Sequence, residues 1–239
     1  MRYKRPSALY IFILISFIFL VTGLEAREYV RYLKSPPNFN SIVVDDAFKV
    51  NIHKGKILEA KVYGTEDDVK RVVLRVVDGN LEIRKMHTPF IGIHFEGVPR
   101  VEVTLPNLEA ITINGSGTTS SPDRFEGMTL NVTTAGSGLI NLSNVNYKNT
   151  VVVISGSGNT VLSGISPHLD VTLSGSGIFN GEKLKAMDAN VTITGSGEVR
   201  PNVMKTLNAT VSGSGSVYYL GKPNVNRVIT GSGDVTSLK

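Results

Sequence analysis

The sequence predicts an all-β protein built as a parallel β-solenoid, in which short strands wind around one axis and stack coil upon coil. Three observations lead to this expectation: a glycine-rich tripeptide that recurs at nearly constant spacing, an alternation of apolar and hydroxyl-bearing residues before each copy, and enough apolar residues for a core. Of the 239 residues, 41% are hydrophobic and 19% are charged. This composition excludes a wholly disordered chain.

The tripeptide Gly-Ser-Gly occurs seven times, with 16 to 21 residues between the starts of successive copies. A nearly constant period of this length is typical of one supersecondary unit per repeat, stacked on the next. Glycine suits a corner where backbones stack closely, because it lacks a Cβ atom and accepts positive φ. We therefore assign the glycines of the seven triplets as structural corners: Gly115, Gly117, Gly136, Gly138, Gly156, Gly158, Gly175, Gly177, Gly195, Gly197, Gly213, Gly215, Gly231 and Gly233.

The residues before each triplet have the period of a β-strand with one buried face. Two and four positions before the first glycine the residues are mostly apolar, as at Val171 and Leu173, and at the positions between they are mostly Ser or Thr. Two positions after the second glycine another inward residue recurs, such as Phe179. Each repeat is thus strand, corner, strand and a variable return segment. One coil cannot bury its own apolar face, so it must stack on its neighbours.

Other all-β architectures fit the repeat less well. A β-sandwich has turns at short intervals but does not require the same tripeptide at every second one. A β-propeller blade needs about 40 residues and four strands. A calcium-binding β-roll would carry Gly-Gly-x-Gly-x-Asp, and the Asp is missing here.

Residues 1–26 are predicted to be a signal peptide. Arg2, Lys4 and Arg5 precede an almost wholly apolar run from Ala8 to Val21, and Ala26 is a plausible cleavage point. The protein is therefore expected to be exported, to the periplasm, the outer surface or the medium. The alternative is an uncleaved anchor, since the run is only slightly shorter than a spanning helix, and this anchor would be the one contact with a membrane.

Behind the signal, residues 27–40 contain two prolines and are predicted to be a linker, and residues 41–239 are predicted to be one β-helix domain. Residues 106–239 hold the Gly-Ser-Gly coils, whereas residues 41–105 lack the triplet and form either the first coils or a separate cap. A loop is expected at 88–99 and one helical turn at 65–70. Strands are expected at 41–45, 47–53, 57–63, 71–77, 80–84 and 100–105.

Composition also excludes several kinds of function. The absence of cysteine removes disulfides, thiolate zinc sites and cysteine nucleophiles. The whole chain has a net charge of +5, but residues 1–26 hold three basic residues and one acidic residue, so the remainder carries only +3. No segment combines clustered Lys and Arg with aromatic residues, and we therefore expect no binding to nucleic acid.

Three segments together resemble a known family. They are Phe39-Asn40-Ser41-Ile42-Val43-Val44 through Phe48-Lys49-Val50-Asn51-Ile52 with Gly55, then Val101-Glu102-Val103-Thr104-Leu105-Pro106-Asn107-Leu108, and the Gly-Ser-Gly coils. The combination is similar to the DUF2807 family, the head GIN domain named after auto-transporter adhesins, over about residues 39–239. The resemblance implies a right-handed, single-stranded parallel β-helix without an established enzymatic activity, in exported proteins of Bacteroidetes-like bacteria. It brings no catalytic or ligand-binding residues to this chain.

The residues themselves predict no catalytic, metal-binding or cofactor-binding site. A β-helix enzyme that cleaves polysaccharides needs carboxylates close together, or a calcium ion held by Asp with a basic residue nearby. The carboxylates of the coils lie at different offsets in their repeats, and the four histidines are scattered. The triplets are not a phosphate cradle, because strands rather than a helix follow them. We expect a protein that is not an enzyme; a carbohydrate-active enzyme is the alternative.

The outward hydroxyl groups before the corners form the one candidate binding face. They are expected to line up in a flat, nearly uncharged sheet that could bind a glycan or an envelope protein, or could be plain solvated strand. Tyr218 and Tyr219 on the following strand are the nearest aromatic residues, one pointing outward and one inward. The candidate face comprises Thr133, Thr172, Ser174, Thr192, Thr194, Thr210, Ser212, Tyr218 and Tyr219.

The last coil must protect the open end of the solenoid. Arg227 falls at an inward position where earlier coils have Val, Ile or Ala, which is typical of edge protection. No cap helix follows, so we expect either frayed final residues or a contact between copies of the chain. Together these features predict an exported, adhesin-like binding module with an unknown ligand, with a purely structural envelope subunit as a further alternative.

Overall fold

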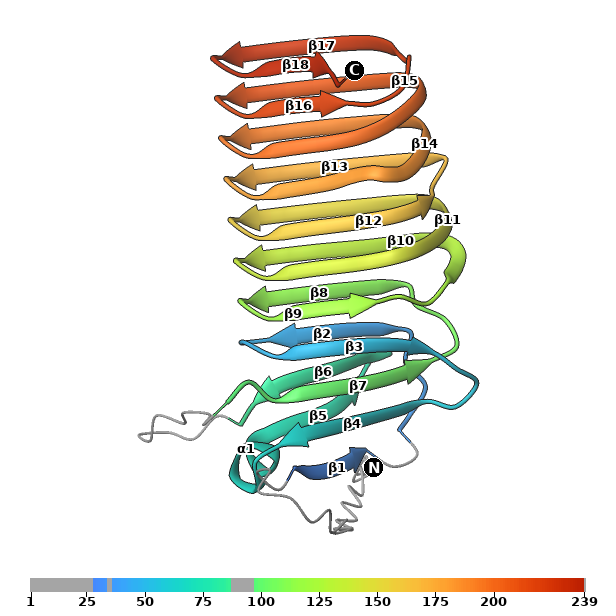
Figure 1. The fold of residues 1–239 in the computed structure, drawn as a ribbon, viewed down its shortest axis with the longest axis vertical. Coiled ribbons are helices and arrows are strands. Elements are labelled where there is room, and N and C mark those ends of the chain that lie inside the picture. Colours follow the sequence, from blue (N-terminus) through green and yellow to red (C-terminus); the bar gives the residue numbers. More distant parts are fainter. Residues whose placement is uncertain (1–27, 34–35, 87–96, 239) are drawn as a thin grey trace, which may run out of the picture.

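A computed structural model describes residues 28–33, 36–86 and 97–238 of the protein. The structure is nearly all β, with 73% strand and 3% helix, and forms a β-solenoid of about six turns. All eighteen strands belong to a single sheet that winds around the long axis (Figure 1). The predicted signal peptide lies outside the described residues.

Two parallel ladders of strands form the walls of the coils, one before the corners and one after them. Strand pairs follow the repeat, so that Val132 of one coil is aligned with Ile111 below it and Val152 above it. Several strands continue through the return bend and so belong to both ladders. The strands are β8 (Ala110–Gly115), β9 (Thr118–Ser121), β10 (Phe125–Gly136), β11 (Leu139–Gly156), β12 (Asn159–Ile165), β13 (His168–Gly175), β14 (Ile178–Gly195), β15 (Glu198–Gly213), β16 (Ser216–Tyr219), β17 (Asn224–Gly231) and β18 (Asp234–Ser237).

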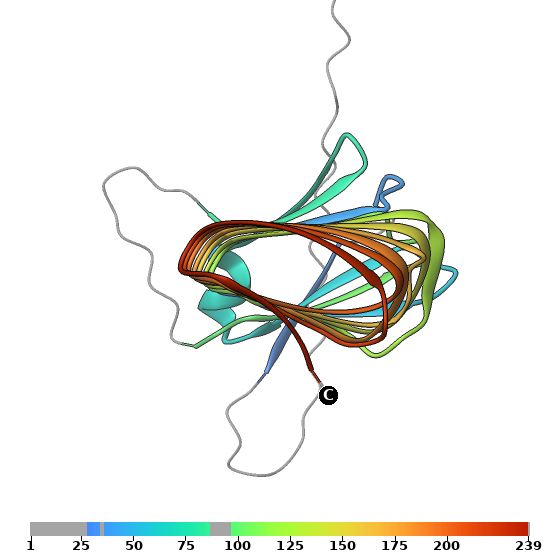
Figure 2. The ribbon, with the colours of Figure 1, turned by 90° about the horizontal axis from the view of Figure 1, so that it is seen from above.

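The seven triplets stack in one column. Their first glycines are aligned from coil to coil, and each has a positive φ, between 112° and 137°. From the second triplet on, the backbone N–H of the middle serine donates to the carbonyl oxygen of the first glycine one coil earlier, as from Ser137 to Gly115 at 2.9 Å. Seen from the C-terminal end, β17 enters the corner and β18 leaves it, so the chain turns anticlockwise as it rises (Figure 2). The predicted right-handed parallel β-helix is confirmed.

The core is a continuous stack of inward side chains between the two ladders. Ile113, Ile154, Leu173 and Ile193 are fully buried before their corners, and Phe179 is fully buried after its corner. Because each coil places its apolar residues at the same offsets, the same face is buried in every turn.

Residues 41–105 add coils to the same sheet, but not in chain order. Strands β2 (Ser41–Asp45) and β3 (Lys49–Lys54) lie between two other coils: β2 pairs in parallel with β6 (Asn80–Lys85) and β8, and β3 with β7 (Arg100–Leu105) and β9. Their corner is Asp46-Ala47-Phe48, where Asp46 has a φ of 74° and lies against Gly115. A non-glycine residue thus replaces the first glycine at the lower end of the column.

Antiparallel strands and a short helix close the N-terminal end. Here β4 (Glu59–Gly64) pairs with β7, and β5 (Val72–Val77) pairs with β6. Helix α1 (Glu66–Arg71) lies between them, and the Thr65 hydroxyl accepts a hydrogen bond of 3.2 Å from the Asp68 amide. All six strands expected before residue 106 are present, with ends within two residues of those expected. The loop expected at 88–99 falls mostly on residues 87–96, which lie outside the described residues.

The expectation of a linker over residues 27–40 is corrected by strand β1 (Tyr29–Leu33), which pairs antiparallel with β4. Tyr29 and Leu33 are partly buried against the core, so β1 covers the outer edge of β4. Residues 29–33 are Tyr-Val-Arg-Tyr-Leu, whose aromatic and β-branched side chains favour a strand, whereas the prolines at 36 and 37 are typical of a linker.

Candidate functional site

The hydroxyl residues predicted to form a binding face lie together on the wall before the corners. Thr133, Thr172, Thr192 and Thr210 occupy one column of outward positions, and Ser174, Thr194 and Ser212 occupy the next. The columns stay straight because parallel pairing keeps the register from coil to coil. Six of these side chains are exposed and Thr133 is half-buried. We call the outward columns one, three and five positions before the corners, from β8 to β17, the hydroxyl face; the column with His168 and Asp188, seven positions before the corners, lies next to the return bends.

The hydroxyl face is almost free of charge. Its members are mainly Thr, Ser, Asn and small apolar residues, and Asp170 is its only charged side chain from β8 to β17. Val153 and Val228 are exposed members that add apolar area. A surface of this composition offers hydrogen-bond donors and acceptors in fixed rows and selects neither cations nor anions.

A ladder of amide side chains runs along the same wall and was not among the predicted site residues. Asn226 donates to Asn208 at 2.9 Å, Asn208 donates to Asn190 at 2.9 Å, and Asn190 donates to Asp170 at 2.7 Å. All four lie five positions before a corner, so their shared offset in the repeat could have revealed them.

The two predicted tyrosines do not belong to the hydroxyl face. Both lie on β16, which pairs with the strands after the corners and therefore forms the opposite wall. Tyr219 packs against the core, and Tyr218 is half-buried. The corner reverses the chain, so residues close in sequence on its two sides belong to different walls. The hydroxyl face as the structure has it contains no aromatic side chain from β8 to β17.

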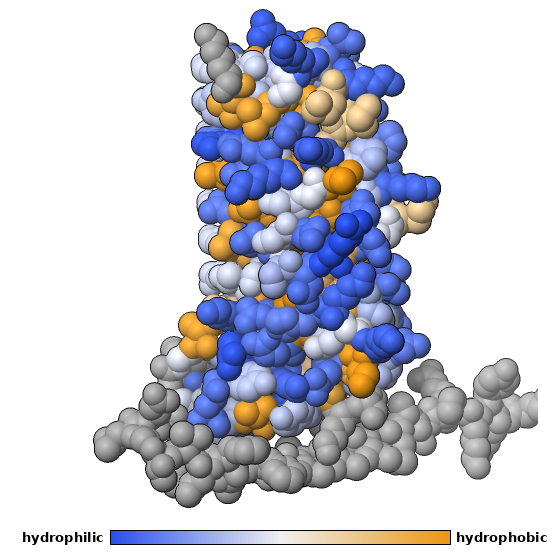
Figure 3. Space-filling model, turned by 45° about the vertical axis from the view of Figure 1, so that its right-hand side comes forward, coloured by the Kyte–Doolittle hydropathy of each residue, from blue (hydrophilic) through white to orange (hydrophobic). Residues whose placement is uncertain are grey.

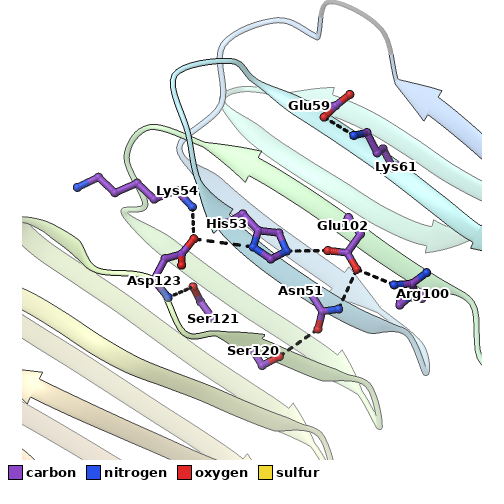
Figure 4. Close-up of polar contacts among 10 residues, drawn as sticks. All are labelled: Asn51, His53, Lys54, Glu59, Lys61, Arg100, Glu102, Ser120, Ser121 and Asp123. Carbon is purple, nitrogen blue, oxygen red and sulfur yellow. Dashed lines mark hydrogen bonds and ion pairs between the residues drawn. The ribbon is translucent and has the colours of Figure 1, made fainter.

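The opposite wall carries a polar cluster near its N-terminal end (Figure 4). The His53 imidazole lies between two carboxylates, with Nε2 at 2.7 Å from Glu102 Oε2 and Nδ1 at 3.8 Å from Asp123 Oδ2. Asn51 and Arg100 donate to the other Glu102 oxygen at 2.9 and 3.1 Å. Asn51 and His53 lie on β3, Arg100 and Glu102 lie on β7, and Asp123 lies in the turn after β9. They come together because β3 pairs with both β7 and β9.

This cluster has the properties of a network that joins strands. Burial acts to raise the pKa of Glu102, but the hydrogen bonds from Asn51 and His53 and the charges of His53 and Arg100 outweigh it and hold the pKa below its usual value of 4.5. Both oxygens of Glu102 are occupied by donors on the protein itself. A carboxylate held ionised in this way is not suited to act as a general acid.

Most of the other carboxylates of the coils have a basic or hydroxyl partner, and two of them share one arginine. Glu182 and Glu198 both pair with Arg200, Asp188 lies 3.8 Å from His168, and Asp234 bonds to Thr236. Within the residues that the structure describes, no group of three or more His, Cys, Asp or Glu side chains is arranged to hold a metal ion.

One hollow of about 380 Å³ lies beside the first return bends, lined by residues that include Leu108, Glu126, Met128 and Tyr147. The buried Tyr147 hydroxyl donates to the Leu108 carbonyl oxygen, and burial raises the pKa of this phenol. The tyrosine side chain is thus held neutral and fixed in the wall of the hollow.

Comparison with known proteins agrees with this architecture. Residues 38–223 match the model of the DUF2807 family, described as "Putative auto-transporter adhesin, head GIN domain". The chain belongs to the DUF2807 family. Among curated proteins, none matches this DUF2807 chain. No helix in the described part of the chain is both long enough and apolar enough to cross a membrane.

Solved structures share the fold of this DUF2807 chain at low sequence identity. A protein of Bacteroides fragilis described as a putative adhesin is 20% identical, with a TM-score of 0.82 over 90% of this chain and 98% of its own. A protein of Parabacteroides distasonis described as a putative lipid binding protein is 22% identical, with a TM-score of 0.73 over 89% and 97%. A second P. distasonis protein, described as a putative adhesin, is 19% identical, with a TM-score of 0.72 over 90% and 98%.

Proposed function

We propose that this protein is an exported, non-enzymatic binding module of the adhesin type, and that its hydroxyl face contacts a neutral glycan of the cell envelope or its surroundings. The predicted signal peptide supports export, and membership of an adhesin-named family supports attachment as the general role. The single observation that carries the proposal is the straight, nearly uncharged array of hydroxyl and amide groups on one wall of the coils.

The composition of the face favours a glycan over a protein partner. The centres of protein interfaces are enriched in aromatic residues, Met and Arg and depleted in Ser, whereas this face consists mainly of Ser, Thr and Asn. A neutral glycan presents hydroxyl groups that both donate and accept, as do the Thr and Ser side chains here. Rows of such groups in register match a partner that also repeats along its length.

The test is binding of the exported protein to a printed panel of neutral and charged glycans. The face variant Thr172→Lys/Thr210→Lys puts bulk and charge on the hydroxyl face, and Ser176→Lys/Ser214→Lys makes the same change at exposed corner positions. We expect the parent and the corner variant to bind neutral glycans and the face variant to bind about tenfold more weakly or not at all. Thermal unfolding of all three proteins checks that the fold is retained.

Two results would contradict this proposal. If the parent binds no glycan on the panel, the glycan assignment is wrong, and capture of an envelope protein by the parent but not by the face variant would replace it. If glycan binding is equal in the face and corner variants, the hydroxyl face is not the site.

A further inference from the structure

The return bends opposite the corners carry an excess of positive charge. Five lysines are exposed there between residues 148 and 222, and no carboxylate in the described part of the chain lies within ion-pair distance of any of them. Acidic residues of the return bends are already engaged: Glu182 pairs with Arg200 at 3.3 Å and Asp188 lies 3.8 Å from His168. In the bend that also holds Met128, Glu126 pairs with Lys54 at 3.6 Å and Arg124 at 3.5 Å, and Asp123 lies 3.8 Å from His53. The five lysines are Lys148, Lys183, Lys185, Lys205 and Lys222.

Four large apolar side chains are exposed along the same bends. Met128 is 61% exposed, Ile165 is 51%, Met187 is 46% and Met204 is 55%. These are more than a third of the large hydrophobic side chains exposed on the whole described surface, and each lies in a different bend. We call the lysines and these four residues together the return edge.

The register places the apolar residues beside the lysines. Thr129 is aligned with Asn149, so Met128 and Lys148 are neighbours on adjacent coils, and Ile165 is aligned with Lys185. Met204 and Lys205 bulge out where β15 passes β14 next to Met187. In the view that brings this side forward, apolar patches are set among hydrophilic ones down the length of the molecule (Figure 3). The edge is convex, because it is the outer side of the bends (Figure 2).

We propose that the return edge binds the surface of an anionic lipid bilayer. Lysine stems lie along apolar surface while the ammonium groups reach the phosphates, and unbranched methionine side chains can enter the region between headgroups and acyl chains. Each exposed lysine near an anionic surface adds electrostatic attraction to it. The apolar residues between the lysines add hydrophobic contact with the bilayer, which an acidic polymer without apolar groups cannot offer. A straight convex edge suits a flat bilayer better than it suits a folded ligand.

The membrane site is independent of the glycan site. The hydroxyl face is a flank of the coils and the return edge is their rim, so a protein bound along its edge leaves the hydroxyl face open to solvent. The two proposals therefore fail separately, since substitutions on one surface leave the other unchanged.

The test is flotation of the exported protein with vesicles of phosphatidylcholine alone or with an equal part of phosphatidylglycerol, after mass spectrometry has established its N-terminus. We expect binding to the anionic vesicles only. Lys148→Glu/Lys205→Glu should weaken this binding about tenfold or more. The control Lys49→Glu/Lys70→Glu changes net charge by the same amount at exposed lysines away from the return bends, one just after the Asp46-Ala47-Phe48 corner and one on α1, and should retain most of the binding. Met187→Ser/Met204→Ser should weaken binding about threefold or more.

Several results would overturn the proposal. Equal partition into both vesicles, or no partition, excludes an anionic bilayer as the partner. Equal losses in the two lysine variants mean that net charge alone attracts the protein. Binding to soluble dextran sulfate without binding to vesicles assigns the edge to an acidic polymer, and an unchanged methionine variant removes the apolar contact. Retention of the far-ultraviolet circular dichroism spectrum in every variant keeps these outcomes interpretable.

Discussion

The side-chain amide of Asn208 donates a hydrogen bond of 2.9 Å to the side-chain oxygen of Asn190, one coil earlier. Asn226 continues the ladder upward and Asp170 ends it below. Each bond joins equivalent positions of adjacent coils, so it favours the correct register as well as the contact itself.

Replacing the middle member of this ladder should destabilise the protein. Asn208→Ala removes two side-chain hydrogen bonds, and because the site is exposed we expect a loss of about 1 kcal/mol in the free energy of unfolding. Asn131→Ala is the matched control, since Asn131 lies in the same column between Ala110 and Val151. Denaturant unfolding measures both, and equal losses would show that the ladder adds nothing.

A Cβ atom at a corner should be costly. Gly136 has a φ of 112°, and a Cβ atom there would lie 2.6 Å from the carbonyl oxygen of Gly115. We expect Gly136→Ala to lower the free energy of unfolding by about 2–4 kcal/mol, because both the backbone conformation and the stacked carbonyl oppose the change. Ser137→Ala, at the exposed middle position, should stay within about 0.5 kcal/mol. Similar thermal midpoints for the two variants would contradict this role of the first glycine.

Buried threonines should respond in opposite directions to the same substitution. The Thr150 hydroxyl is buried and has no hydrogen-bond partner in the described residues, so Thr150→Val should raise the free energy of unfolding by about 1 kcal/mol. The Thr134 hydroxyl bonds to Thr160 at 3.0 Å, so Thr134→Val should lower it by about 1–2 kcal/mol, because Thr160 is left unpaired. A double Thr134→Val/Thr160→Val variant should recover part of the loss. Chemical denaturation measures the free energy of unfolding of each variant. A Thr150→Val protein less stable than the parent would refute the expected gain from removing the unpartnered hydroxyl.

Acid should weaken the cluster around His53. The pKa of Glu102 lies below 4.5, so its ionised form favours the folded state; the contribution is complete above the unfolded pKa and is lost as the pH falls through the folded pKa. Glu102→Gln should therefore be less stable than the parent by about 1 kcal/mol at neutral pH, and the difference should shrink below about pH 4.5. The control Glu109→Gln changes an exposed carboxylate outside the cluster. If the difference in the free energy of unfolding between the parent and Glu102→Gln is the same at neutral and acid pH, ionised Glu102 does not stabilise the fold through this cluster.

The coils could be predicted because each one has the same surroundings as the next. A residue such as Leu173 is buried by Ile154 and Ile193 at the same offset, so the local period already describes the packing. The same logic placed Thr172 and Thr192 in one column, and it assigned Arg227 to an inward position. Arg227 is indeed aligned with Ala209, and at the open end its guanidinium reaches the carbonyl oxygen of Val235 at 3.2 Å.

The unrepeated part of the chain could not be predicted in this way. Nothing in the sequence indicates that β2 and β3 lie between β6–β7 and β8–β9, because this order depends on pairings between segments that share no repeated pattern. The polar cluster follows from that order: His53 and Glu102 are 49 residues apart in the chain and become neighbours only when β3 pairs with β7.

By itself the sequence determined the class of fold, the corners, the buried face of every coil and the columns of hydroxyl groups, since in a solenoid the contacts between neighbouring coils repeat with the chain. Only the tertiary structure decided the order of the N-terminal coils, the wall to which Tyr218 belongs and the gathering of lysines and methionines on the return edge. Those properties depend on the direction in which the chain turns at each bend and on pairing between distant segments. Neither is encoded in a local period.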